Sequence, residues 1–254
     1  MALLRETYYL YLRNLKIWVG QPWAVVSSVL GSAFVFLFFG APLGQVTQLP
    51  LFPTGDYNAY LTGMVLVMTV VFSGSDMAFA VLTDILSGYF DKLLLAPIHR
   101  LAILFGTLLV GGTRALIQVV IIVLLALALG VSFKTGVVGI LAAIVIATVF
   151  GIAWTCLGLI IALKTKSAQV TQSSWLLFMP LAFLTTAFMP KEYLSGWFKV
   201  AVTFNPVDYV VVAVRAIVIQ GWAWEVILPG LYVLAVMTAV LTAGATWVYR
   251  RATA

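Results

Sequence analysis

Long runs of apolar residues, each about the length of a membrane-crossing helix, constrain this chain more than any other feature. A helix rises 1.5 Å per residue, so about twenty apolar residues cross the roughly 30 Å hydrocarbon core of a bilayer. Of the 254 residues, 63% are hydrophobic and only 9% are charged, whereas a soluble domain is about one quarter charged. We therefore expect an all-α integral membrane protein.

The apolar runs predict six transmembrane helices in one membrane domain that covers residues 1–254. The expected spans are 23–43, 58–82, 101–130, 137–163, 170–189 and 226–249. Six crossings place both termini on one side, and that side carries nine Lys and Arg residues against four on the other. The positive-inside rule therefore predicts a multi-pass protein of the cell (plasma) membrane with both termini in the cytoplasm. The net charge of +6 comes from residues that flank apolar runs, so it indicates topology rather than a nucleic-acid partner.

Residues 1–21 do not read as a span, because charged residues interrupt them. Apolar and aromatic residues recur there at steps of three and four, which places them on one helical face. They are Leu4, Tyr8, Tyr11, Leu15 and Trp18. This pattern predicts an amphipathic helix in the cytoplasmic membrane interface, with Arg13, Lys16 and Trp18 as interfacial residues. A soluble helix packed on a partner is the alternative.

The segment 190–225, between the fifth and sixth expected spans, contains an apolar stretch that is short and interrupted by Arg215. We expect an external re-entrant helical hairpin, whose backbone survives at membrane depth only when protein shields it. A seventh span is the alternative and would place the C-terminus outside. Arg250 and Arg251 argue against that alternative.

Catalytic and metal-binding signatures are missing from the sequence. Both Lys-Thr pairs, at Lys134 and Lys164, lack the glycine that precedes the lysine of a Walker A loop. A single His99 and a single Cys156 do not make a metal-ligand cluster. We therefore expect no catalytic residue, no metal and no cofactor bound by this chain.

Two ionisable residues, Asp76 and Arg114, lie inside expected spans. Such groups are costly in a membrane and form a functional hypothesis by default. They either line a polar cavity or are satisfied by neighbouring polar groups, and we favour the second interpretation. Because the two lie at different depths along their spans, a direct salt bridge between them is not expected.

A substrate path is expected along the first, second and fifth spans, which combine aromatic, thioether and polar side chains. Helix packing explains the same residues equally well. The candidates are Phe34, Phe38, Met64, Met68, Asp76, Gln172, Trp175 and Thr185.

The connector between the second and third spans, residues 84–97, holds a large share of the few charges. It predicts a short amphipathic cytoplasmic helix with Asp84, Asp91 and Lys92 facing outward, and Pro97 ends it. A solvated loop is the alternative, but it leaves Tyr89 and Phe90 without a partner. A docking surface for a cytoplasmic protein explains both the apolar and the charged residues.

With these motifs, the sequence resembles the membrane-spanning subunits of type-2 ABC exporters, particularly the daunorubicin-resistance permeases. Their first cytoplasmic loop reads acid-x-x-x-Gly-x-x-acid-x-Leu-Leu-x-x-Pro-x-x-Arg. It is matched here by Asp84, Gly88, Asp91, Leu93, Leu94, Pro97 and Arg100. A second family pattern, after the fifth span, is matched by Pro190, Trp197, Asn205, Pro206, Tyr209 and Arg215. Ile85 and Tyr89 depart from the first pattern.

The resemblance implies that residues 84–97 form a coupling helix, which includes Tyr89, Phe90 and Lys92, and that it docks in a groove of a separate ATPase subunit. It further implies two such ATPases, which bind ATP and Mg²⁺, and a second membrane subunit that is a copy or a related chain. The implied function is ATP-driven export of a hydrophobic or amphipathic substrate, such as a drug, natural product or lipid-like molecule. Lipid-linked polysaccharide export on the same scaffold and ion-coupled secondary transport are the alternatives.

Overall fold

The computed structural model describes residues 2–20, 22–40, 42–50 and 52–252, with a few side chains inside helices left out of the description. Every regular element among these residues is a helix, which confirms the prediction of an all-α fold. The α-helices are α1 (Ala2–Val19), α2 (Pro22–Gly40), α3 (Tyr57–Leu86), α4 (Tyr89–Leu95), α5 (Arg100–Ala128), α6 (Gly136–Thr165), α7 (Ala168–Gln172), α8 (Phe178–Phe183), α9 (Gly196–Phe204), α10 (Pro206–Ile219) and α11 (Trp224–Ala252). Short 3₁₀ helices cover Gly44–Gln48, Ser173–Leu177 and Lys191–Tyr193.

Four helices of the described chain, α3, α5, α6 and α11, are long and apolar enough to cross a membrane, and α9 with α10 makes a fifth if the bent pair is one span. The four correspond to the second, third, fourth and sixth expected spans. The first expected span, 23–43, falls on α2, in which Val29–Gly40 forms a shorter apolar helix. The structure therefore supports a multi-pass membrane protein, whereas the number of six spans stays a prediction.

The fifth expected span, 170–189, is not a single α-helix, so this span is not confirmed. Its residues divide among α7, the 3₁₀ helix Ser173–Leu177 and α8, and the helix ends at Phe183. Pro180 lacks the N–H that would continue the hydrogen-bond ladder. Carbonyl groups freed beyond this point bind side chains of α3 and α10 instead.

Helix α3 is the central element of the bundle and contacts α2, α5, α6 and α10. Small residues let it approach α6 closely: a Cβ atom on Gly74 would lie 2.9 Å from the Thr155 nitrogen, and one on Gly158 would lie 2.7 Å from the Ala78 Cβ. Because lipid gives helices no hydrophobic drive to associate, such close van der Waals contacts hold a membrane bundle together.

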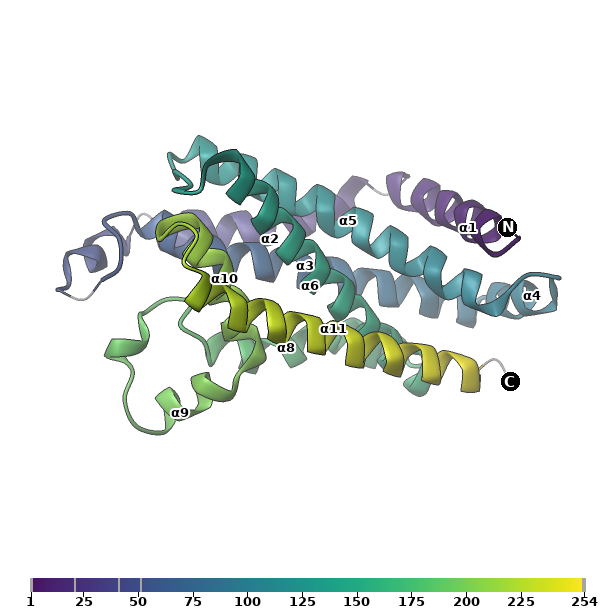
Figure 1. The fold of residues 1–254 in the computed structure, drawn as a ribbon. Coiled ribbons are helices and arrows are strands. Elements are labelled where there is room, and N and C mark those ends of the chain that lie inside the picture. The colour runs from purple at the N-terminus through teal and green to yellow at the C-terminus, as the bar shows by residue number, and fades with distance from the viewer. Residues whose placement is uncertain (1, 21, 41, 51, 253–254) are drawn as a thin grey trace.

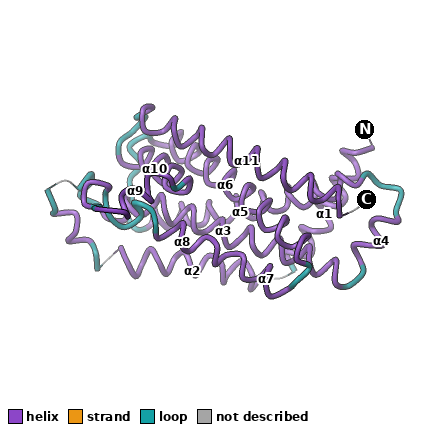
Figure 2. The backbone as a smooth tube through the Cα atoms, turned by 90° about the horizontal axis from the view of Figure 1, so that it is seen from below, coloured by secondary structure: helices purple, strands orange, loops and turns teal. Residues whose placement is uncertain are grey.

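The two ends of the bundle differ. Both termini and α4 lie at one end, whereas α9 and the loop between α5 and α6 lie at the other (Figure 1). The loop is fixed there because Lys134 N–H donates to the Val218 carbonyl and the Thr135 hydroxyl donates to the Ile217 carbonyl. Figure 2 shows the same arrangement from below. The two termini share one end of the bundle (Figure 1), while their cytoplasmic location stays a prediction.

Helices α9 and α10 meet at an angle of 81°, within the segment predicted to be a re-entrant hairpin. Asn205 sits at the bend and caps α10, because its side-chain oxygen accepts a hydrogen bond from Val207 N–H. Pro206 follows at the first helical position, where its missing N–H costs nothing. A bent pair of this kind is either a broken span or a re-entrant element, so the external hairpin stays a prediction.

Candidate functional site

The charged connector folds differently from the helix predicted over residues 84–97. Helix α3 continues through Asp84 to Leu86, and Gly88 then takes a left-handed conformation with φ of 71°. Glycine adopts this conformation without the steric cost that other residues have. The chain turns there, so the separate helix α4 has only seven residues, and Pro97 lies beyond its end.

Helix α4 has one face against the bundle and one exposed face. Phe90 is buried, its ring lies 6.0 Å from the Tyr249 ring of α11, and Leu93 packs into the same cluster. Asp91, Lys92 and Leu95 are exposed, with 87% of Leu95 accessible. The Leu94 side chain lies outside the described residues. The contacts of Phe90 and Leu93 with the bundle therefore fix the position of the exposed face of α4.

Helix α1 holds both ends of this connector. The Arg13 guanidinium donates to both oxygens of Asp84, at 2.8 and 3.0 Å, and lies 3.9 Å over the Tyr89 ring. The hydrogen bonds to Asp84 raise the pKa of Arg13 above its ordinary value, so the guanidinium stays charged. At the far end, His99 N–H donates to the Glu6 carboxylate at 2.8 Å. Asp84 was expected to face outward, and the ion pair with Arg13 corrects that prediction.

The remaining residues predicted for the interfacial helix lie on different faces of α1. Trp18 is buried, and its ring lies 5.5 Å from the Arg114 guanidinium, whereas Lys16 is exposed. Leu10 and Tyr11 pack closely over Gly106 of α5. The helix over this segment is confirmed, while its amphipathic face and its location in the membrane interface stay predictions.

Asp76 and Arg114 form a direct ion pair, contrary to the sequence prediction. Arg114 Nη2 lies 3.2 Å from Asp76 Oδ2. Asp76 is ten residues before the end of α3, and Arg114 is fourteen residues after the start of α5. At 1.5 Å per residue the two depths differ by about 6 Å. The long arginine side chain covers this difference, which an estimate from depth alone leaves out.

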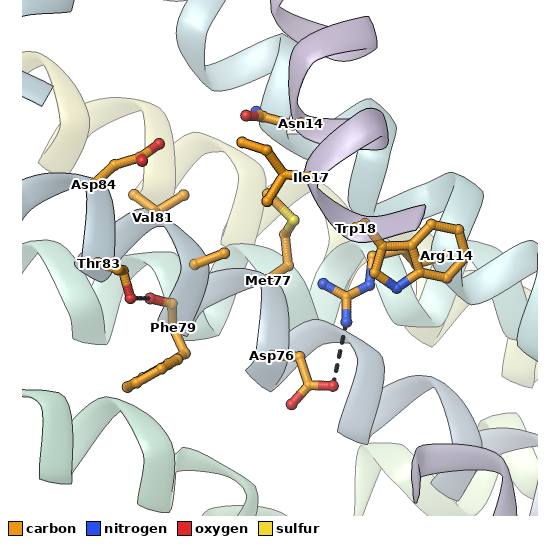
Figure 3. Close-up of a pocket in the computed structure, with 11 residues that line it drawn as sticks. Asn14, Ile17, Trp18, Asp76, Met77, Phe79, Val81, Thr83, Asp84 and Arg114 are labelled. Atoms are coloured by element: carbon orange, nitrogen blue, oxygen red, sulfur yellow. Dashed lines mark hydrogen bonds and ion pairs between the residues drawn. The ribbon is translucent and has the colours of Figure 1, made fainter. Parts of the chain in front are cut away.

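This pair lines a cavity of about 400 Å³ between α1, α3 and α5 (Figure 3). Helix α1 contributes Asn14, Ile17 and Trp18, α5 contributes Arg114, and α3 contributes residues from Asp76 to Asp84. Sequence reasoning identified Asp76 here but missed the wall formed by α1, because no local pattern shows that α1 crosses α3 and α5 at this level.

The other predicted substrate-path residues do not meet in this cavity. Phe34 and Phe38 stack on each other on an exposed face of α2, and Met64 is buried in the core. Met68 is partly buried beside the core, and Thr185 is buried at the broken helix. The side chains of Gln172 and Trp175 lie outside the described residues. A path shared by all eight residues stays a prediction.

At the opposite end of the bundle, Arg215 of α10 is the centre of a buried polar network. It donates to the Tyr60 carbonyl at 3.0 Å and to the Thr186 carbonyl at 2.8 Å. The Thr186 hydroxyl accepts from Arg215 and donates to Asp208, which links the two charged groups. The Asn205 side chain donates to the carbonyls of Leu181 and Leu184.

Two of the predicted motif residues, Asn205 and Arg215, thus bind the freed carbonyls of the broken helix. Pro190 is buried and Trp197 is exposed on α9, while the Tyr209 hydroxyl donates to the Thr203 carbonyl. Pro206 opens α10. Asp208 and Thr186 were not singled out from the sequence, although a carboxylate two helical turns before Arg215, on the same face of the helix, offered a signal.

Several curated proteins are similar to this chain. It is 29% identical over 199 residues to the daunorubicin resistance ABC transporter permease protein DrrB1 of Streptomyces coeruleorubidus, an alignment that covers 76% of this chain and 66% of the relative. It is 21% identical over 209 residues to the probable doxorubicin resistance ABC transporter permease protein DrrC of Mycobacterium tuberculosis, with 82% and 75% covered. It is 24% identical over 199 residues to the putative transport permease ycf38 of Cyanophora paradoxa, with 77% and 68% covered.

A family model described as ABC-2 type transporter matches residues 5–219, a range that includes most of α1, the connector with α4, and the network around Arg215. The family is one of membrane subunits of ABC transporters, which work with an ATPase component. This match covers most of the chain, and the chain therefore belongs to the ABC-2 type transporter family.

Proposed function

We propose that this chain is the membrane subunit of an exporter that moves a hydrophobic or amphipathic molecule out of the cytoplasm or the inner leaflet. ATP and Mg²⁺ bind to separate ATPase subunits, two per transporter, and a second membrane subunit completes the path. Both termini and α4 lie on the cytoplasmic side of the plasma membrane. The drug-resistance names of the relatives support a drug-like or lipid-like cargo.

The single observation that carries this proposal is the two-sided structure of α4. Its inner face is fixed to α11 through Phe90 and Tyr249, and its start is fixed to α1 through Asp84 and Arg13. Its outer face presents Asp91, Lys92 and Leu95 at the end of the bundle where both termini lie (Figure 1). A helix fixed in this way transmits a push from a docked protein into α3 and α5, which flank it in the chain.

Photo-crosslinking tests the docking site directly. A photoreactive amino acid replaces Leu95 of α4 in the chain co-expressed with the ABC ATPase that is its proposed partner. We expect a covalent product with the ATPase after illumination. The matched control replaces Val137, which is 72% exposed at the opposite end of the bundle. Equal crosslinking from both positions, or none from position 95 in a complex that purifies intact, would contradict docking at α4.

A further inference from the structure

The cavity between α1, α3 and α5 is built like a small-molecule site rather than a packing defect. Its volume of about 400 Å³ lies within the range of ligand pockets, roughly 300–1,000 Å³. Apolar and aromatic side chains such as Ile17, Met77 and Phe79 make up much of its wall, and a few polar groups are grouped within it (Figure 3). This combination of an apolar wall and a few placed charges is typical of binding sites.

The charges in the cavity are arranged so that carboxylate, not guanidinium, is accessible. The Asp76 side chain is 45% exposed, whereas that of Arg114 is only 5% exposed. Asp84, two helical turns further along α3, also lines the cavity and keeps 26% of its side chain exposed. A molecule that enters the cavity therefore meets the free edge of Asp76 first, with the arginine behind it.

A second observation points to a missing ligand. The Arg114 Nε and the Trp18 indole Nε1 are buried donors that find no acceptor among the described residues. Both side chains are more than nine-tenths buried and line the cavity. Buried donors are nearly always partnered in native structures, so two of them beside one cavity indicate an acceptor that a bound molecule supplies.

The ligand class follows from these groups. An anion would face two carboxylates, and a neutral molecule would leave the Asp76 carboxylate in apolar surroundings with a single 3.2 Å contact. A cation satisfies Asp76, and an oxygen beside the cationic centre satisfies the buried donors. We propose that this cavity binds an amphipathic cation, with its charged group on Asp76 and its apolar body against Phe79 and Met77.

The cavity lies beside the contact that joins α1 to the connector. Asp84 lines the cavity and also holds Arg13, which lies over Tyr89 at the start of α4. A bound cation thus lies beside the contact that joins α1 to the connector. If the export function proposed above holds, this cation is the transported substrate. Its binding then changes the surroundings of Asp84 and so acts on the contact between α1 and α4, the helix on which the ATPase docks.

Binding at Asp76 is tested with two ions of similar size and opposite charge, tetraphenylphosphonium and tetraphenylborate, which carry no acceptor for the buried donors and therefore test the charge selectivity of the cavity alone. The full chain is placed in nanodiscs of phosphatidylglycerol, and empty discs measure partition into lipid. We expect saturable binding of tetraphenylphosphonium and none of tetraphenylborate beyond partition. Equal binding of both ions, or no saturable binding of the cation, overturns the proposal.

Variants locate the site. Asp76→Asn is expected to weaken tetraphenylphosphonium binding by about tenfold or more, because a desolvated charge contact is lost. Ala80→Phe places bulk in the cavity and leaves Asp76 and Arg114 unchanged, so it tests the cavity independently of the Asp76 charge, and the same loss of binding is expected. Asp91→Asn, on the exposed face of α4, is the matched control and is expected to bind normally. Wild-type affinity in Ala80→Phe, or an equal loss in Asp91→Asn, places any binding elsewhere and overturns the assignment.

A lipid amine and a free solute share this chemistry. Repeating the titration in discs that contain phosphatidylethanolamine distinguishes them: weaker cation binding assigns the cavity to a lipid headgroup, and unchanged binding assigns it to a solute. Neither measurement needs the ATPase. If the chain binds the cation but binds no ATPase, only the proposed function is refuted. If the chain forms an active complex with the ATPase but does not bind the cation, only this inference is refuted.

Discussion

The guanidinium of Arg13 and the carboxylate of Asp84 form a two-contact ion pair across 71 positions of sequence, with distances of 2.8 and 3.0 Å. Both side chains keep about a quarter of their surface exposed. Partly exposed ion pairs contribute on the order of 1 kcal/mol or less to stability. The pair therefore matters for the position of α1 relative to the connector more than for the stability of the fold.

Arg13→Gln is expected to lower transport-coupled ATP hydrolysis severalfold with little change in thermal unfolding, because it frees the start of the connector from α1. The measurement is the ATPase rate of the purified complex in nanodiscs. Lys16→Gln, on an exposed position of the same helix, is the control. The exchanged pair Arg13→Asp with Asp84→Arg restores the contact and is expected to recover part of the rate. Equal rates in Arg13→Gln and wild type would show that α1 has no part in coupling.

The ion pair of Asp76 and Arg114 predicts an asymmetric effect of removing either partner. Asp76→Asn leaves the more deeply buried charge uncompensated, whereas Arg114→Gln leaves a carboxylate that the cavity partly solvates. Thermal unfolding in detergent is expected to show the larger destabilisation for Asp76→Asn, about 1–3 kcal/mol. The unfolding temperature of the double variant is expected to lie nearer to that of wild type than the unfolding temperature of Asp76→Asn does. The opposite order would mean that the cavity does not solvate Asp76.

The network around Arg215 predicts a large stability effect far from α4. Arg215→Leu leaves the carbonyls of Tyr60 and Thr186 without their donor and leaves Asp208 without its nearby cation. Breaking a buried charged network in this way costs roughly 3–5 kcal/mol. Unfolding of the purified chain in detergent measures the loss, and Lys199→Leu on exposed α9 is the matched control. A similar unfolding midpoint for both variants would contradict a structural role for the network.

The close approach of α3 and α6 predicts that Gly74 tolerates no larger residue. A Cβ atom there would lie 2.9 Å from the backbone nitrogen of Thr155, which does not move aside as a flexible side chain does. Gly74→Val is expected to destabilise the bundle by about 1–3 kcal/mol through overpacking. Gly44→Ala adds its Cβ to open space and is the control. The comparison is made by thermal unfolding, and equal midpoints would show that the two helices separate at little cost.

Much of the fold was predictable because it follows from composition and periodicity. The four long spans, the amphipathic α1 and the break at residues 204–206 each have a local signal in hydropathy, helical spacing or an Asn-Pro pair. The division of the fifth expected span into short helices was not predicted, because an apolar run with Pro180 reads as one kinked helix. Its actual path depends on Arg215 and Asn205, which bind its carbonyls from another helix.

The site was less predictable than the fold because its contacts are long-range. The motif identified α4 and Asp84, but not the pairing of Asp84 with Arg13, which joins two amphipathic segments 71 residues apart. The bounds of α4 depend on the left-handed Gly88, which a pattern of apolar residues does not show. The cavity is formed by residues of three helices. The sequence therefore identified Asp76 as a candidate residue but did not place Trp18 and Phe79 beside it in the cavity wall.

The most direct test of the central claim is ATP hydrolysis by the complex of this chain with the ABC ATPase that is its proposed partner, purified and reconstituted in nanodiscs. Leu95→Asp changes the exposed face of α4, and Val137→Asp makes the same change at the opposite end of the bundle. We predict that wild type and Val137→Asp retain the ATPase and hydrolyse ATP, whereas Leu95→Asp loses the partner and folds normally. A complex that forms and hydrolyses ATP equally well with Leu95→Asp would contradict the role of α4 as the point where the energy of ATP enters this chain.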